Sequence, residues 1–400
     1  MSNGDGEADV RAAAARAIAI FSVCGFASTF AMRFVDPMIG VIARDVGADP
    51  HTVALLSSAY ALPYAFVQPV LGPVGDALGK ERIIKICLVV LALALGASCL
   101  AGDLTTIFIL RVAAGAAGGG IIPLVLASIG DRVPMAERQV AISRFLLFSI
   151  SGQLLGGTVA GFLAGLVGWR GVFALAAVLA GLGSAAVLVA FRSASETGGR
   201  FSVATAVSRY GRILSIGRAR ALFLFVFVEG AIIFGVQPYI APLLEARGAG
   251  GSTEAGLIIA GYAVGGIVYT LAVRQLLRIL GLRRMLTVAG FLCAAAFLTL
   301  GAARTWQADA LAMLGMGVGF YMLHNSFQTQ VTELVADARA SAVSLHAFSY
   351  FLGQAIGPAV LGLELTAFGE APAMILNAIA ISIFGLVAAA VIGAPQPRPR

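Results

Sequence analysis

Seven ionisable side chains lie in long apolar runs, where a charge is costly and is therefore expected to serve a function. They are Arg33, Asp36, Arg111, Glu229, Glu333, His324 and His346. Glu229 is the one charged residue of "FVFVEGAIIFG", so its carboxyl group is expected either to be protonated and hydrogen-bonded or to face a cavity. Carboxylates and imidazoles in such places are suited to proton exchange, and arginines are suited to pairing with an acid or attracting an anion.

The elements that position these groups are membrane-spanning helices. The chain has 400 residues, of which 59% are hydrophobic and 12% charged, about half the charge of a soluble domain. About 20 apolar residues span a bilayer, and alternating strand patterns are absent. The sequence predicts twelve spans: 17–42, 53–74, 83–102, 105–129, 141–166, 171–191, 221–243, 255–274, 285–303, 308–333, 341–365 and 372–393.

Basic residues set the predicted orientation of these spans. If the N-terminus is cytoplasmic, twenty-one Lys and Arg residues fall on the cytoplasmic side and four on the outer side. The positive-inside rule therefore favours cytoplasmic termini. The net charge of +7 follows from these loops and does not indicate nucleic-acid binding. The four cysteines all lie in apolar runs without metal-ligand spacing, and we expect no metal site and no disulfide framework.

The two halves of the chain repeat one another. "SGQLLGGTVAG" (151–161) in the fifth span aligns with "LGQAIGPAVLG" (352–362) in the eleventh, and "LGKERIIK" (78–85) aligns with "LGLRRMLT" (280–287). Parallel six-span repeats are typical of transporters. The sequence predicts an N-terminal bundle over 1–191, a polar cytoplasmic linker over 192–220 and a C-terminal bundle over 221–400.

The loop after the second span, "GPVGDALGKER" (72–82), resembles the signature loop of the major facilitator superfamily. The residues that match it are Gly72, Asp76, Gly79, Lys80 and Arg82. The resemblance implies an all-α membrane fold of two six-helix bundles related by a pseudo-two-fold axis. It also implies that this loop acts as a cytoplasmic latch that gates the transporter.

Within the superfamily the chain resembles the drug:proton antiporter branch and its sugar-efflux relatives. "RVAAG" (111–115), "GQLLGGTVAG" (152–161) and "GWRGVF" (168–173) carry this resemblance. The antiporter signature has a proline where this chain has Gly157. Small residues on one face of the fifth span allow close helix approach and suit an interface that rocks. These residues are Gly152, Gly156, Gly157 and Gly161.

In antiporters of this branch an acid late in the first helix couples to an arginine of the fourth helix, and Asp36 and Arg111 match those positions. The resemblance therefore implies that Asp36 carries the proton and that Arg111 is its switching partner. Arg33 pairs locally with Asp36 or attracts an anionic substrate in this interpretation. The structural alternative is that Arg33 reaches the outer headgroups and that Asp36 caps the helix end before Pro37.

Further side chains are expected to contact the substrate. The tenth span is unusually polar in "HNSFQTQVTE" (324–333), which suits either a water-filled cavity or polar contacts between helices. Glu229 is expected to act as a second proton site or to anchor a cation. The predicted substrate-binding residues are Arg33, Tyr60, Tyr64, Gln68, Phe234, His324, Asn325, Gln328, His346, Tyr350 and Gln354.

The sequence favours proton-coupled efflux of a small organic molecule by a functional monomer of a bacterial inner membrane. Facilitated or proton-coupled uptake of a nutrient, and export of a sugar or organic anion, remain alternatives. The chain has no phosphate-binding loop, nucleophile constellation or metal cluster. An enzyme is therefore not expected, and no cofactor is expected. The expected partners are a substrate, protons and the lipid bilayer.

Overall fold

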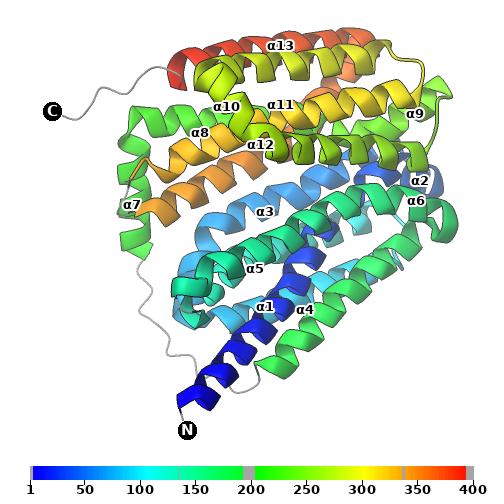
Figure 1. The fold of residues 1–400 in the computed structure, drawn as a ribbon. Helices are drawn as coiled ribbons and strands as arrows, with labels where there is room; N and C mark the ends of the chain where they lie inside the picture. Colours follow the sequence, from blue (N-terminus) through cyan, green and yellow to red (C-terminus); the bar gives the residue numbers. More distant parts are fainter. Residues whose placement is uncertain (1–2, 134, 192–202, 336–337, 393–400) are drawn as a thin grey trace. The chain divides into compact units, whose positions relative to one another are not determined.

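The computed structural model describes residues 3–133, 135–191, 203–335 and 338–392, which form α-helices joined by short connections (Figure 1). The chain divides into two compact units. Unit 1 comprises Met1–Val35 and Ala59–Val207, and unit 2 comprises Asp36–Ser58 and Ser208–Arg400. The segment Asp36–Ser58 thus groups with the C-terminal part of the chain, although the predicted N-terminal bundle runs over 1–191. The predicted bundle boundaries stay a prediction.

Unit 1 contains five long helices, four of them wholly. They are α1 (Asn3–Arg33), most of α3 (Pro50–Leu78), α4 (Lys80–Ser98), α5 (Leu104–Arg132) and α6 (Met135–Ala190). Helix α1 packs along α6, and α4 packs against both α5 and α6 (Figure 1). Asp103 begins α5 as its N-cap, since its carboxylate accepts a 2.8 Å hydrogen bond from the Thr106 amide.

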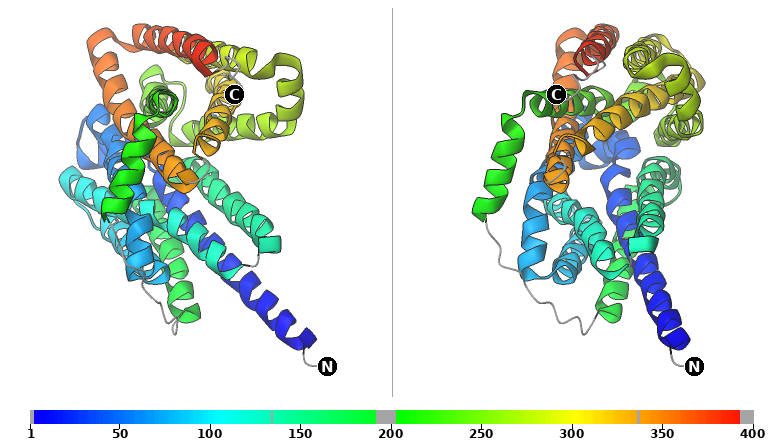
Figure 2. Two further views of the ribbon diagram at one scale, coloured as in Figure 1. Left: turned by 90° about the vertical axis from the view of Figure 1, so that its left-hand side faces the viewer. Right: turned by 60° about the vertical axis from the view of Figure 1, so that its left-hand side comes forward.

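Unit 2 repeats this arrangement mostly with the second half of the sequence, and it also includes Asp36–Ser58 from the first half. Its elements are η1 (Asp36–Met38), α2 (Ile39–Val46), α8 (Gly217–Gly235), η2 (Gln237–Tyr239), α9 (Ile240–Arg247), α10 (Ser252–Ala302), α11 (Trp306–Thr332), α12 (Arg339–Phe368) and α13 (Glu370–Ile392). Helix α8 packs on α12 as α1 packs on α6, and α10 packs on α11 and α13. Figure 2 follows these helices from two further sides.

Two glycines break the longest helices. Gly168 inside α6 has φ 69° and ψ 169°, and Gly281 inside α10 has φ 63° and ψ 173°. Glycine adopts these positive φ values without the Cβ clash that other residues would suffer. Each break separates two of the predicted spans, 141–166 from 171–191 and 255–274 from 285–303.

The predicted first and seventh spans are not continuous helices. Each contains a short 3-10 turn, at Asp36–Met38 and at Gln237–Tyr239, with a proline as its middle residue. Proline lacks the amide hydrogen of a helix and clashes with the preceding turn, so the α-helix ends there. Short helices α2 and α9 follow these turns, and both end at left-handed glycines, Gly47 and Gly248.

The predicted polar linker 192–220 is partly helical. Helix α7 (Val203–Ser215) lies within it, and α8 begins at Gly217, before the predicted start at 221. The prediction described this segment only as a polar linker, and arginines and serines are tolerated on the exposed face of a helix. Residues 192–202 lie outside the part of the chain that the structure describes.

Many large apolar side chains point outward, which a membrane protein requires. Leu93, Leu271 and Leu363 are 67%, 79% and 72% exposed. Among the described residues, eight helical ranges are long and apolar enough to cross a membrane. Helices α6 and α10, which glycines interrupt, count as one range each. Helices α4 and α11 also overlap predicted spans, but α4 carries four charged residues in its first two turns and α11 ends in a polar stretch. The chain is a multi-pass membrane protein.

Glycines at equivalent positions of the two halves allow neighbouring helices to pack closely. An ideal Cβ on Gly152 of α6 would lie 2.9 Å from Phe26 Cα of α1, and one on Gly353 of α12 would lie 3.0 Å from the Phe227 carbonyl carbon of α8. Each Cβ would come closer still to a backbone carbonyl oxygen, that of Phe26 or that of Phe227, than real Cβ atoms do. These aligned positions therefore require glycine because backbone meets backbone there.

We expect Gly152→Ala to destabilise the protein by about 1–3 kcal/mol because the added methyl group must push α1 and α6 apart. Gly181→Ala is the matched control, since Gly181 lies in the same helix with nothing within 4 Å of its Cβ position. That control should stabilise the helix by up to about 1 kcal/mol. Thermal midpoints in detergent would measure both, and equal midpoints for the two variants would contradict the packing argument.

Candidate functional site

Arg111 is completely buried in unit 1, where it binds the end of α1. Its guanidinium donates hydrogen bonds to the carbonyl oxygens of Ala31 at 2.8 Å and Met32 at 3.5 Å. These carbonyls belong to the last turn of α1, which has no intrahelical donors for them. The positive charge also complements the negative end of the helix dipole. Arg111 thus has a structural role at the end of α1.

Aromatic rings complete the surroundings of Arg111. Its Cζ lies 4.3 Å from the centroid of the Tyr60 ring, a cation–π distance. Tyr60 stacks on Tyr64 with 5.9 Å between ring centroids, and both rings are buried. Gln68, one turn further along α3, donates a 2.9 Å hydrogen bond to the Gly119 carbonyl oxygen. The structure therefore brings Arg111, Tyr60 and Tyr64 together and anchors Gln68 to α5.

Asp36 is the buried first residue of η1, only 1% exposed. Its Oδ1 accepts a 2.5 Å hydrogen bond from the hydroxyl of Ser57, which also belongs to unit 2. Sequence reasoning did not single out Ser57, because its only sequence signal is its place in an apolar helix. Arg33, 6% exposed, ends α1. The coupling of Asp36 to Arg111 stays a prediction, because the two residues belong to different units.

The predicted gating loop joins α3 to α4 in unit 1. Gly79 has φ 92°, a value that favours glycine, and α4 begins at Lys80. Lys80 Nζ lies 2.6 Å from Asp131 Oδ2, and Glu81 pairs with Arg132, so both pairs tie the start of α4 to the end of α5. Sequence reasoning missed both partners.

Six further residues belong to the gating prediction. Arg82 is exposed, and the side-chain surroundings of Gly72 and Asp76 lie outside what the structure describes. Gly156 continues the close approach of α6 to α1, since its ideal Cβ would lie 3.1 Å from Phe30 Cα. Gly157 and Gly161 are buried in the same helix. A role of these residues in gating remains a prediction.

A second group of predicted residues meets in unit 2 around Glu229. Glu229 of α8 is completely buried, and its Oε2 lies 3.0 Å from Nδ1 of His324 on α11. The His324 side chain is 14% exposed. A buried carboxylate with an imidazole partner can exist as a charged pair or as a neutral pair. Both forms hold the same single proton, on the imidazole or on the carboxyl group, and the pair releases it only when both groups become deprotonated.

Aromatic rings enclose this pair. His324 stacks on Phe320 at 5.0 Å and lies 4.6 Å from the Tyr350 ring and 5.2 Å from the His346 ring, measured between centroids. Phe234 meets the Tyr350 ring edge-on at 5.6 Å. We call Glu229, His324, His346, Tyr350, Phe234 and Phe320 the Glu229 cluster. Four of these had been predicted as substrate-binding residues and Glu229 as a proton site.

The Glu229 cluster keeps unused hydrogen-bonding capacity. Glu229 Oε1 and His346 Nε2 are buried and have no hydrogen-bond partner among the described protein residues. Leaving a buried polar atom unpaired costs about 1–3 kcal/mol. Such atoms are therefore expected to meet a water, a proton or a substrate group during the working cycle. Gln354 of α12 is also buried, 2% exposed.

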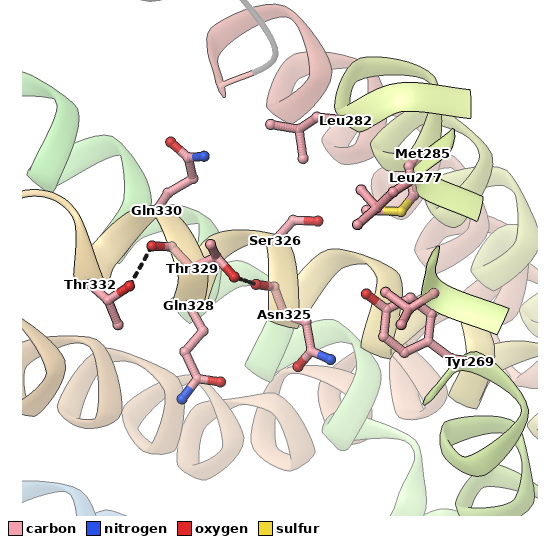
Figure 3. Close-up of a pocket in the computed structure, with 11 residues that line it drawn as sticks. Tyr269, Leu277, Leu282, Met285, Asn325, Ser326, Gln328, Thr329, Gln330 and Thr332 are labelled. Carbon is pink, nitrogen blue, oxygen red and sulfur yellow. Dashed lines mark hydrogen bonds between the residues drawn. The ribbon is translucent and has the colours of Figure 1, made fainter. Parts of the chain in front are cut away.

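A cavity of about 550 Å³ lies between α10 and α11 in unit 2 (Figure 3). We call it the α10–α11 pocket. One wall is the polar side of α11, with the predicted residues Asn325 and Gln328, and the other is an apolar stretch of α10. His324 and Asn325 are adjacent in sequence, but His324 belongs to the Glu229 cluster and Asn325 lines the pocket. The tenth-span prediction therefore describes two separate places.

Metal chemistry has no support among the described residues, where no group of three or more His, Cys, Asp or Glu side chains could hold an ion. Cys24, Cys87, Cys99 and Cys293 are free thiols. What the arrangement offers instead is a buried acid–imidazole pair in unit 2 and a buried arginine among aromatic rings in unit 1.

Comparison with known proteins identifies the fold. A family model described as Major Facilitator Superfamily matches residues 21–358. The nucleoside transporter NupG has a solved structure that superimposes with a TM-score of 0.76 at 15% identity, over 95% of this chain and all of that chain. A bacterial homologue of the human lysosomal transporter Spinster gives a TM-score of 0.72 at 17% identity, over 94% of this chain and 95% of that chain.

Sequence relatives agree with this fold. The MFS-type transporter YwfA of Bacillus subtilis, itself uncharacterised, is 22% identical over 88% of this chain and 86% of its own length. MdtD of Salmonella paratyphi B, whose name refers to multidrug resistance, is 23% identical over 56% of this chain and 46% of its own length. The family model spans most of the chain, and the all-α fold agrees with it. This chain therefore belongs to the major facilitator superfamily, a family of membrane transporters.

Proposed function

We propose that this protein exports a small organic molecule in exchange for protons, by alternating access. The observation that carries the proposal is the buried pair of Glu229 and His324, 3.0 Å apart in helices that are predicted to line the central cavity. Burying a carboxyl group within a membrane-spanning helix costs free energy, so such a group is expected to be functional. Proton exchange is a function that a carboxyl group can perform. The relative MdtD, named for multidrug resistance, supports export as the direction.

In the proposed cycle, the Glu229 cluster takes up a proton on the side where protons are concentrated and releases it on the other side. Water reaching the cluster favours the charged carboxylate, whereas closure around it favours the protonated form. A substrate that binds one of these two states more tightly than the other would couple its own movement to that of the proton. Asp36 serves as a second proton site in this proposal, with Ser57 holding its carboxyl group and Arg111 as its predicted partner.

Asp36→Asn tests the second site. We expect this variant to fold, because the amide keeps the size of the side chain and can still accept the Ser57 hydrogen bond. Proton-coupled transport should fall to the background rate, since an amide cannot exchange a proton. Unaltered coupling in a folded Asp36→Asn protein would remove Asp36 from the mechanism.

The proposal as a whole is tested in everted membrane vesicles that carry the protein and an imposed pH gradient, read with a pH-sensitive dye. Organic cations, neutral sugars and their glycosides, and organic acids would be added in turn. Proton exchange predicts that one class dissipates the gradient in vesicles with the protein and not in vesicles without it. Labelled compounds that cross the membrane while the gradient stays intact would instead establish uncoupled transport.

Uncoupled or uptake transport is the second candidate function. It is favoured by Gly157, which stands where the antiporter signature of the fifth helix has a proline. The same vesicles distinguish the two candidates, because facilitated diffusion moves the substrate in both directions irrespective of the pH gradient.

The proposal places the protein in a bacterial inner membrane as a functional monomer with both termini in the cytoplasm. The bacterial relatives and the distribution of basic residues support this location. Cysteine labelling from either side of the membrane at the start of α7 would test the orientation, since residues 203–215 are predicted to be cytoplasmic.

A further inference from the structure

The α10–α11 pocket has a chemical character that indicates what it binds. Its volume of about 550 Å³ is in the range of small-molecule sites. Its described lining residues all belong to unit 2, and none of them is a member of the Glu229 cluster.

The hydroxyl groups on the α11 wall present acceptors to the pocket. Ser326, Thr329 and Thr332 each donate their hydroxyl hydrogen to a backbone carbonyl oxygen of α11 at 2.7 Å. Figure 3 draws the last two of these bonds. A hydroxyl whose hydrogen is already used can only accept a further hydrogen bond. A ligand that satisfies this wall must therefore carry donors, such as hydroxyl groups of its own.

An amide on the same wall adds a donor. Gln330 Oε1 accepts a 2.5 Å hydrogen bond from Arg218 Nη2 of α8, which fixes the amide orientation and leaves its NH₂ group to donate. Asn325 and Gln328 contribute two further amides. The described lining residues include no Asp, Glu, Lys, Arg or His. A charged ligand would thus lose part of its hydration without a direct ion pair to a lining side chain, and Arg218 is already engaged with Gln330, whereas a neutral polar ligand loses little.

The opposite wall is apolar. Val273, Leu277, Leu282 and Met285 of α10 form it, together with the ring of Tyr269. A polar wall with matched acceptors and donors, facing an apolar wall, fits a molecule that has one hydroxylated side and one hydrophobic side.

We propose that the α10–α11 pocket binds an uncharged glycoside, a hydroxylated ring joined to an aromatic or aliphatic group, and that this is the exported substrate. The sugar hydroxyls meet the α11 wall, and the apolar group lies against α10. The assignment to the substrate rests on the proposed function, but binding in the pocket does not.

A matched series of probes tests the charge argument on the unaltered protein in lipid nanodiscs. The probes are p-nitrophenyl β-glucoside, the corresponding glucuronide with a carboxylate, and the corresponding glucosaminide with a free ammonium group. We expect the neutral glucoside to bind at least about tenfold more tightly than either charged probe, measured by calorimetry. Equal or tighter binding of a charged probe, or no binding of the glucoside, overturns the proposal.

Two variants locate the site. Thr329→Val removes one pocket acceptor at nearly constant volume, and glucoside binding should weaken by about tenfold. Thr299→Val is the matched control, because the Thr299 hydroxyl makes the same kind of bond to its own helix, to the Ala295 carbonyl oxygen at 2.9 Å, and does not line the pocket. The control should bind like the unaltered protein. Similar weakening in both variants, or in neither, contradicts the assignment.

The pH-gradient vesicles separate this inference from the proposed function. If the glucoside binds and is transported without dissipating the gradient, the pocket assignment stands and proton exchange fails. If another compound class dissipates the gradient and the glucoside neither competes with it nor is transported, the pocket is not the substrate site. If the glucoside dissipates the gradient and Thr329→Val weakens this effect, both proposals are supported.

Discussion

Glu229→Gln is expected to abolish substrate-driven proton flux while leaving the protein folded. The amide has the size of the carboxyl group, stays neutral and can still hydrogen-bond His324, which now lies 3.0 Å from Glu229 Oε2. It cannot take up or release a proton. The dye signal in everted vesicles should therefore fall to that of vesicles without the protein, whichever compound drives the flux.

The buried position of Glu229 explains why we expect a complete loss of function, as for Asp36→Asn. The carboxyl group is completely buried in α8, and its Oε1 has no hydrogen-bond partner among the described residues. An amide that fills this place removes the cost of burying a charge, so Glu229→Gln should be at least as stable to heat as the unaltered protein. Loss of flux with unchanged or higher thermal stability would identify proton exchange rather than misfolding.

Glu333→Gln is the matched control for this experiment. Glu333 follows the end of α11 and is exposed, so its carboxylate is hydrated and its replacement should change neither flux nor stability. Glu229→Asp is informative as well, because it keeps the acid but shortens its reach to His324, and it should retain part of the flux. Full coupling in Glu229→Gln would exclude Glu229 as a proton carrier.

Arg111→Met is expected to be the most destabilising substitution in unit 1, by about 2–4 kcal/mol. It removes the charged donors to the Ala31 and Met32 carbonyl oxygens and the cation–π contact with Tyr60, which contribute about 1.5–3 and about 0.5–2 kcal/mol in comparable sites. Methionine fills much of the volume of the arginine side chain, so the decrease in stability measures the contribution of the polar contacts. The thermal midpoint in detergent measures it.

Arg111→Lys separates the structural role of Arg111 from its predicted coupling role. Lysine keeps the charge, but its compact ammonium group cannot reproduce the planar fork that reaches two carbonyl oxygens. We expect an intermediate thermal midpoint. If this variant is folded but uncoupled, the predicted partnership with Asp36 gains support. An Arg111→Met protein with an unchanged midpoint would contradict the anchoring of α1 by Arg111.

Some of the helix ends could be predicted, and some could not. The apolar runs located most of the spans, and Gly281 is one of the glycines at which the structure separates two of them. The 3-10 turn at Pro238 was missed because hydropathy continues through it, and a helix end at Pro37 was considered only as the structural alternative for Asp36. The helix α7 was missed because its exposed polar residues resemble those of a loop.

The sequence by itself determined the membrane class, the internal repeat and the identity of the buried ionisable residues, because hydropathy, residue type and spacing are local properties of the chain. Only the tertiary structure decided their partners. Ser57 meets Asp36, His324 meets Glu229, and Asp131 meets Lys80. Each partner comes from another helix or turn, and which side chains meet depends on how the helices rotate and pack. No local pattern in the sequence encodes that rotation, so the composition of the Glu229 cluster and the separation of the α10–α11 pocket from it became visible only in three dimensions.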